Sequence, residues 1–325
     1  MGPAMKATDI QIFAKALVIA MLALVDTFWI MASDFTIRVE SAITALVMIG
    51  LLLGLGQFYR HFRDPQDRKI GIVCEEIAAL VAFSLAAAIF SYLVLSTGRP
   101  PIDSYLLAID AALGFDWEGY VDYVIHHPVF GPLSMVAYMS SLAQVTVLVI
   151  WSSFTGRTAL TQRFMASVML GALSCIVISG LLPSAGAVGT IQPPDSFFVT
   201  RQPFVNVDYM ETYFQLRDGG ARVLDFATLK GMISFPSYHG TLSVLIMLAF
   251  LSARRFVVPA FILNALVLLA TPVDGGHHMS DVLAGVSIAV FCWYLAGVFC
   301  AWTEKLAQEA AAVASTAGTP ACADA

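Results

Sequence analysis

The chain has 325 residues, of which 58% are hydrophobic and only 12% are charged, whereas about 25% are charged in an ordinary soluble domain. This composition, with a mean hydropathy of +0.79, excludes a soluble globule and predicts that most of the chain lies in lipid. The net charge of −6 excludes a nucleic-acid partner, because binding a polyanion needs a basic stripe that is absent. The five cysteines lie far apart and predict neither a disulfide framework nor a zinc finger.

Charged residues mark where the chain can cross a membrane, because an ionised side chain in the hydrocarbon core costs roughly 2.5–3.5 kcal/mol. Windows without such charges, the first broken by Asp26, are long enough to cross a core of about 30 Å. The eight windows lie between residues 15 and 34, 40 and 60, 76 and 99, 122 and 157, 163 and 195, 230 and 254, 255 and 274, and 281 and 304. We expect an all-α, polytopic membrane helix bundle of about eight transmembrane helices, with Asp26 facing its interior and making a structural hydrogen bond.

The hydropathy pattern divides the chain into three predicted parts. Residues 1–70 form an N-terminal two-helix transmembrane region, whose first apolar run is too long for a removable signal peptide. Residues 71–302 hold the other windows and form the main membrane domain. Residues 303–325 are rich in Ala, Thr, Gly and Pro and are expected to be a disordered tail.

Basic residues in short loops predict the topology, because Lys and Arg accumulate on the cytoplasmic side of a membrane. The loops after the second, fourth and sixth windows hold Arg60, Arg63, Arg68, Lys69, Arg157, Arg163, Arg254 and Arg255. We therefore expect these loops and both termini to lie inside. Residues 99–131, 182–236 and 274–281 are then expected on the outer face.

Two short polar stretches stand at the outer ends of the sixth and eighth windows. The first is Ser-Phe-Pro-Ser-Tyr-His-Gly (234–240) and the second is Gly-Gly-His-His-Met-Ser-Asp (275–281). His277 and Asp281 are spaced i,i+4, so on a helix they share a face and the carboxylate accepts the Nδ1–H of the imidazole. The Nε2 atom is then unprotonated and points away, as a nucleophilic or metal-ligating histidine requires.

The first stretch predicts an anion site at a helix start. Ser237 follows a proline and is a fair cap, so the first free N–H groups of the helix can face an anion. Either stretch alone is equally typical of solvated or capping residues at a helix end. His239 and His277 are 38 residues apart, which fits one helix in and one helix back. The topology therefore brings both histidines to the same outer face.

The outer loop before the first stretch is unusually basic for its side of the membrane. Its basic residues are Arg201, Arg217, Arg222 and Lys230. An anionic ligand explains this excess, although pairing with neighbouring acidic residues is the better explanation for Arg201 and Arg222. Those acidic residues are Asp208, Glu211, Asp218 and Asp225.

A zinc or manganese site is a further alternative at the second stretch. Its ligands would be Asp274, His277, His278 and Asp281. We consider it the weaker interpretation, because this spacing matches no standard ligand motif.

The two stretches resemble motifs of the type-2 phosphatidic acid phosphatase superfamily, and more closely of its branch of inositol phosphorylceramide synthases and their bacterial relatives. Phe-Pro-Ser-Tyr-His-Gly (235–240) is similar to the second motif of the superfamily, Pro-Ser-x-His. Gly-Gly-His-His-Met-Ser-Asp-Val-Leu-Ala-Gly (275–285) is similar to the third, His-x-x-x-Asp. The resemblance covers roughly residues 99–290, with Arg99-Pro100 and the run 113–117 as weaker support. It makes 71–302 the expected catalytic domain.

The chain departs from the superfamily at two cationic positions. The Lys expected seven residues before Arg99 is Tyr92, and the Arg expected six residues before His277 is Thr271. In the synthase-like branch an Arg in a Leu-Arg-x-Gly stretch substitutes, which points here to Arg217 in Leu-Arg-Asp-Gly.

The resemblance implies an integral membrane lipid phosphatase or phosphotransferase that needs no metal or other cofactor. His277 would attack phosphorus to form a phosphohistidine, with Asp281 orienting its ring. His239 would protonate the leaving oxygen and then deprotonate the incoming nucleophile. The residues implied to bind the phosphate are Arg217, Lys230, Ser237 and Gly240.

The implied partners are a lipid phosphate and the membrane, at the extracytoplasmic leaflet of a bacterial inner membrane. Water as acceptor gives a phosphatase, whereas a lipid or inositol hydroxyl gives an inositol phosphorylceramide synthase-like headgroup transferase. A transporter or flippase with Asp26, His239 and Asp281 as a proton relay is an alternative from another class. It predicts inverted repeats, which the sequence lacks. A purely structural scaffold leaves the paired histidines unexplained.

Overall fold

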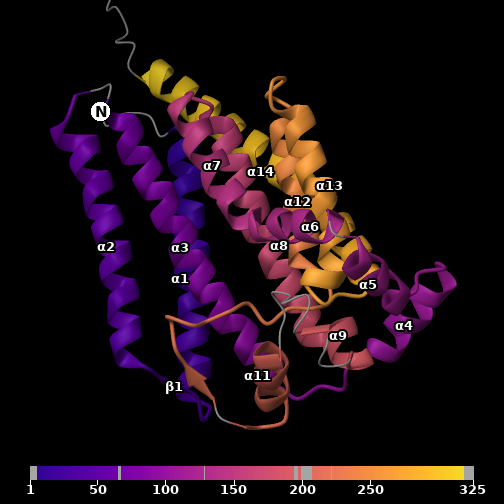
Figure 1. Ribbon diagram of the computed structural model, residues 1–325. Coiled ribbons are helices and arrows are strands. Elements are labelled where there is room, and N and C mark those ends of the chain that lie inside the picture. Colours follow the sequence, from indigo (N-terminus) through magenta and orange to yellow (C-terminus); the bar gives the residue numbers. More distant parts are fainter. Residues whose placement is uncertain are drawn as a thin grey trace, which may run out of the picture.

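Long apolar stretches form long helices here, because a helix satisfies every backbone polar group within its own segment in lipid. The computed structural model describes residues 6–64, 67–127, 129–193, 197–198, 207–220 and 222–317. The long helices are α1 (Ala7–Met31), α2 (Val39–Phe62), α3 (Arg68–Leu95), α8 (Thr158–Leu181), α13 (Val257–Asp274) and α14 (Met279–Ala317). They form one bundle (Figure 1).

Shorter elements complete the described part of the chain. The short helices are α4 (Asp103–Ala112), α5 (Trp117–His126), α6 (Phe130–Met139), α7 (Ser141–Phe154), α9 (Gly186–Ile191), α11 (Val207–Arg217) and α12 (Tyr238–Phe250). Two short strands, β1 (Thr36–Ile37) and β2 (Val223–Leu224), pair in parallel. This pairing ties the loop between α1 and α2 to the segment after α11.

The predicted all-α, polytopic membrane helix bundle is confirmed, but the number of eight spans is not. Among the described residues, 6 helices are long and apolar enough to cross a membrane, or 7 if the bent pair α6 and α7 counts as one span. That pair bends by 50°, so one predicted window is broken into two helices. The α12 helix has only 13 residues and falls below the length of a full span.

The α8 helix packs against α3, α12 and α14 and so lies at the centre of the bundle. A core cluster joins Phe164 and Met165 of α8 to Val149 of α7, Leu245 of α12 and Ala289 of α14. The α2 helix packs chiefly on α3 and lies at the edge of the bundle (Figure 1). Shared packing on α8 therefore holds α12 and α14, which carry the two polar stretches, against each other.

Several charged side chains lie inside the bundle. Lys15 Nζ is 2.7 Å from Glu76 Oε1, and Gln162 Nε2 donates to the same oxygen at 2.7 Å. The residues that delimit two predicted windows thus pair with each other within their helices. Asp26 is buried as expected. Neither of its carboxylate oxygens has a hydrogen-bond partner among the described residues, so the predicted structural hydrogen bond is not found.

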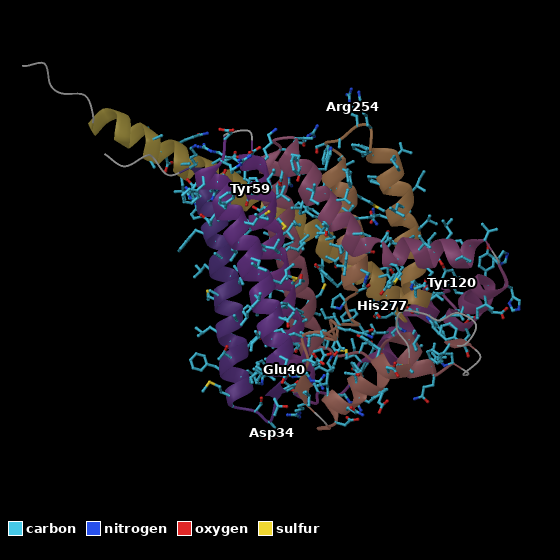
Figure 2. All side chains as sticks on the ribbon, turned by 60° about the vertical axis from the view of Figure 1, so that its left-hand side comes forward. Asp34, Glu40, Tyr59, Tyr120, Arg254 and His277 are labelled. Atoms are coloured by element: carbon cyan, nitrogen blue, oxygen red, sulfur yellow. The ribbon has the colours of Figure 1, made fainter. Side chains whose placement is uncertain are left out.

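The two ends of the bundle differ as the loop charges predict. Figure 2 shows Asp34 and Glu40 at one end and Tyr59 and Arg254 at the other, with His277 toward the end that Asp34 marks. The short helices α4, α9 and α11 lie at this same end (Figure 1). The polar stretches therefore sit opposite the basic loops.

The last helix continues through a region that we expected to be disordered. α14 runs to Ala317, so residues 303–317 are helical, and its end projects beyond the other helices (Figure 2). Alanine has the highest helix propensity, and Lys305 lies 3.8 Å from Glu309 at i,i+4 spacing. These local preferences explain the helix. Residues 318–325 lie outside the described residues.

Candidate active site

The segment between α13 and α14 carries a hydrogen-bonded His–Asp pair. His277 Nδ1 lies 3.2 Å from Asp281 Oδ2, and the two residues are 4% and 0% exposed. Asp281 is in the first turn of α14, and Oδ2 also accepts the backbone N–H of His278 at 3.0 Å. The i,i+4 spacing thus gives the predicted side-chain contact. A buried carboxylate on Nδ1 favours the tautomer with Nε2 unprotonated.

The start of α12 faces this histidine. Ser237 Oγ lies 3.4 Å from His277 Nε2 and caps α12 by accepting the N–H of Gly240 at 3.2 Å. The N–H groups of Tyr238 and His239 begin the helix and have no intrahelical acceptor. Nε2 therefore points to a hydroxyl and to the positive end of a helix dipole, where an anion is stabilised.

Backbone contacts hold the two stretches together. The N–H of Ser237 donates to the carbonyl of Asp281 at 3.0 Å, and Thr241 Oγ1 donates to the carbonyl of Gly285 at 2.9 Å. Gly285 is essential to this approach, because a Cβ atom there would collide with the Ser237 carbonyl oxygen. The last glycine of the stretch 275–285 is thus required by packing.

His239 contacts a tyrosine that we did not predict from the sequence. The Tyr138 hydroxyl of α6 lies 3.2 Å from His239 Nδ1, and the two rings stack with centroids 4.3 Å apart. The same hydroxyl is 2.9 Å from the position that a Cβ of Gly275 would take. Tyr138 therefore lies between the two stretches. Its place within an apolar window gives no sequence signal of this contact.

A second buried His–Asp cluster adjoins the first. His278 is fully buried, with Nε2 3.3 Å from Asp103 Oδ1 and Nδ1 3.7 Å from Asp110 Oδ2. Asp103 also accepts the Ser184 hydroxyl at 2.7 Å. Asp110 accepts the N–H groups of residues 279 and 280 at 2.9 and 2.8 Å and thereby caps α14. Both carboxylates belong to α4, and neither was predicted from the sequence.

The two adjacent histidines have opposite electrostatic environments. Burial and the positive charge of His278 lower the pKa of His277 to about 3, so this ring is neutral at pH 7. Burial also lowers the pKa of His278, but its hydrogen bond to Asp103 and the surrounding carboxylates outweigh burial and raise it. Burial raises the pKa of Asp103, but hydrogen bonds from His278 and Ser184 outweigh this effect and lower it. His278 and Asp103 therefore form an ion pair.

The basic residues of the outer loop are arranged differently from our expectation. Arg217 pairs with its neighbour Asp218, with Nε 2.7 Å from Oδ1. Lys230 is exposed. Among the described contacts, neither cation touches His239 or His277.

Arg222 does not form the predicted pair with an acidic neighbour. Its guanidinium lies over the Phe35 ring, 5.5 Å from the centroid, and its buried Nε has no partner among the described residues. Asp225 instead binds Arg38 at 2.7 Å, because the β1–β2 pairing brings the α1–α2 loop beside it. Arg201 lies outside the described residues.

The positions where the superfamily has cations are filled by uncharged, buried residues. Tyr92 is 7% exposed, and its hydroxyl is hydrogen-bonded to the backbone of Lys230. Thr271 is fully buried and donates to the carbonyl of Val267 at 2.7 Å. A phosphate bound at His277 would therefore need other groups to neutralise its charge.

The described residues contain no group of three or more His, Cys, Asp or Glu side chains arranged to hold a metal ion. The alternative set of Asp274, His277, His278 and Asp281 is thus not assembled as a ligand shell. His278 turns to α4, whereas His277 turns to Asp281 and Ser237.

Comparison with known proteins agrees with the motifs. No curated protein and no solved structure matches the chain. A family model described as the PAP2 superfamily matches residues 104–295, a range that holds both polar stretches and all of α4 except its first residue, Asp103. Because this match covers more than half of the 325 residues, the chain belongs to the PAP2 superfamily.

Proposed function

We propose that this membrane protein is a lipid phosphatase or phosphotransferase whose reaction passes through a phosphohistidine at His277. One observation carries the proposal: a buried imidazole has Nδ1 bonded to Asp281, while its Nε2 faces Ser237 and the start of α12. Burial keeps this ring neutral, because its pKa is lowered to about 3. A neutral imidazole with a free Nε2 lone pair is the form that attacks phosphorus.

The first step transfers the phosphoryl group to His277. The Nε2 lone pair forms an N–P bond, the bond from phosphorus to the leaving oxygen breaks, and its electron pair stays on that oxygen. His239 donates a proton to this oxygen as general acid. Asp281 retains the Nδ1–H bond and offsets the positive charge that develops on the His277 ring.

The phosphate oxygens would be bound at the start of α12. The Ser237 hydroxyl and the N–H groups of Tyr238 and His239 converge there. The N–H of Gly240 already donates to Ser237, so Gly240 contributes through the cap. Arg217 and Lys230 are the proposed cations, and Arg217 would exchange Asp218 for phosphate.

The second step transfers the phosphoryl group from His277 to the acceptor and restores the free histidine. His239 takes a proton from the incoming hydroxyl, whose oxygen forms a bond to phosphorus while the N–P bond breaks. Water as acceptor completes a phosphatase reaction. A lipid or inositol hydroxyl completes an inositol phosphorylceramide synthase-like transfer, which the similarity of motifs supports as the alternative.

The location that we propose is a bacterial inner membrane with the site at the extracytoplasmic leaflet. The supporting observation is that the basic loop residue Arg254 lies at the end of the bundle opposite His277 (Figure 2). The proposed catalytic unit is residues 71–302, and residues 1–70 contribute α1 and α2 at its side.

The test is phosphate release from a panel of lipid phosphates by the detergent-purified protein in EDTA. His277→Ala and His239→Ala proteins with unchanged thermal unfolding are the matched comparison. Release by the parent protein alone supports metal-independent hydrolysis through these histidines. Transfer to ceramide, diacylglycerol or inositol without release supports the transferase. Release that persists in both variants would overturn the assigned site.

A further inference from the structure

A cavity lies at the end of the bundle opposite the proposed active site. It has a volume of about 590 Å³, is open on one side, and is lined by α8, α14, the end of α12 and the two residues that follow it. The Arg254 label in Figure 2 marks this end, two residues after the cavity residue Ser252. Along α14, Glu304 of the cavity lies about 35 Å from Asp281 at 1.5 Å per residue. Trp293, the lining residue of α14 nearest to Asp281, lies about 18 Å from it on the same scale. The cavity therefore extends from within the bundle to the other headgroup level, where Glu304 lies.

Arg163 places a fixed positive charge in this cavity. Its guanidinium stacks on Trp293, 4.2 Å from the ring centroid, and Nη2 donates to the Trp293 carbonyl at 3.0 Å. Gly297 leaves the space for it, because a Cβ there would come within 2.8 Å of Nη2. No partner of Nη1 is found among the described residues, so its two N–H groups remain available to a ligand.

A carboxylate stands further out on the same wall. Gly297 and Glu304 line the cavity and are seven residues apart, so they share a helix face with Glu304 about two turns nearer the end of the bundle. Leu248, Ala249 and Trp293 line its apolar part. The order from the membrane interior outward is apolar surface, cation, carboxylate.

We infer that this cavity binds a phospholipid with a phosphoethanolamine headgroup. An acyl chain would lie on Leu248 and Trp293, the phosphate on Arg163 and the terminal ammonium on Glu304. The charges of Arg163 and Glu304 cancel, which matches a zwitterionic lipid better than an anionic one. A primary ammonium donates hydrogen bonds to a carboxylate, whereas a choline group cannot. This inference concerns a second site and does not depend on the proposed reaction.

The experiment is native mass spectrometry of the full-length, detergent-purified protein with added dioleoyl phosphatidylethanolamine, phosphatidylcholine or phosphatidylglycerol. We expect one tightly bound phosphatidylethanolamine, retained about tenfold better than the other two, the factor for one charge-assisted hydrogen bond. Glu304→Gln should remove this preference while a phospholipid still binds. Arg163→Gln should lower retention of all three lipids.

The matched control is Glu309→Gln, because Glu309 is exposed on the same helix and lies outside the cavity. It should retain phosphatidylethanolamine as the parent protein does. Thermal unfolding shows whether Arg163→Gln is folded. Glu304 is exposed, so Glu304→Gln leaves the core intact. Equal retention of the three lipids, a preference for phosphatidylglycerol, or an unchanged preference in Glu304→Gln would overturn the inference.

Discussion

The Tyr138 ring stacks on the His239 imidazole with an interplanar angle of 23°, and its hydroxyl lies 3.2 Å from Nδ1. A hydroxyl that accepts the Nδ1–H of His239 keeps that proton in place, so that Nε2 is the atom that exchanges protons. The proposed general acid requires this, because the ring protonated on both nitrogens can then give the Nε2 proton to the leaving oxygen and remain neutral. We therefore expect Tyr138 to act on the proposed reaction through His239, as a positioning residue.

Tyr138→Phe should retain the stacking and lose the hydrogen bond to Nδ1. We expect kcat to fall roughly 10- to 100-fold with little change in KM, because general acid–base catalysis contributes about 10²–10⁴-fold in total. The acidic or basic limb of the pH–rate profile should shift as well, which a purely structural role would not cause. Tyr120→Phe is the control, because that hydroxyl donates to Leu269, outside the site. An unchanged pH profile would contradict the role.

Asp281→Asn tests the orientation of the nucleophile. The amide oxygen can still accept the His278 N–H, but its NH₂ group favours the His277 tautomer with the proton on Nε2. We expect kcat to fall about 10³- to 10⁴-fold, as when a triad aspartate becomes asparagine. Protein incubated with ³²P-labelled substrate and quenched with detergent at alkaline pH should show acid-labile, alkali-stable label in the parent and none in His277→Gln. Label retained by His277→Gln would place the phosphoryl group elsewhere.

Local sequence patterns predicted the parts of the site that depend on one helix. The i,i+4 spacing of His277 and Asp281 predicted their contact, and the loop charges predicted the end of the bundle where they lie. Tyr138 and Asp103 could not be found this way. They are 101 and 175 residues from their histidine partners. Only the packing of α6 and α4 in the folded bundle places them next to His239 and His278.

The errors have the same physical origin. Pairing by proximity in sequence gave Arg222 an acidic partner, whereas the β1–β2 contact gives it Phe35. Hydropathy predicted one span between residues 122 and 157, because it reports immersion in lipid and not the direction of the helix axis. The 50° bend between α6 and α7 is what directs α6, with Tyr138, across the site.

The His278–Asp103 pair should make stability depend on pH. The raised pKa of His278 means that its contribution is complete below the unfolded value of 6.5 and is lost as the pH rises through the folded value. The lowered pKa of Asp103 keeps its charge above 3.8. Asp110 and Asp281 also face His278. Both contributions are therefore complete between about pH 4 and 6.5.

Asp103→Asn should cost about 3–5 kcal/mol at pH 5.5, the range for breaking a buried ion pair. The cost should shrink toward pH 9, because His278 loses its proton in both proteins. Thermal unfolding across this pH range measures the difference. Asp122→Asn is the control, since Asp122 and His126 form a similar pair, 3.2 Å apart, that is largely exposed, and its cost should be near zero. A cost for Asp103→Asn that does not vary with pH would show that His278 is uncharged.

Gly285→Ala tests whether the close approach of α12 and α14 builds the site. A Cβ at Gly285 would collide with the Ser237 carbonyl, so we expect a loss of about 1–3 kcal/mol or more from overpacking. Phosphate release should fall as well, because the start of α12 must move and lengthen the 3.4 Å contact between Ser237 and His277. Gly54→Ala is the matched control, since α2 has open space there, and helix propensity should make it stabilising by about 0.5–1 kcal/mol. Thermal unfolding and phosphate release, measured for both variants, separate the loss of stability from the loss of activity. Full activity of Gly285→Ala would mean that the reaction does not depend on the contact of Ser237 with His277.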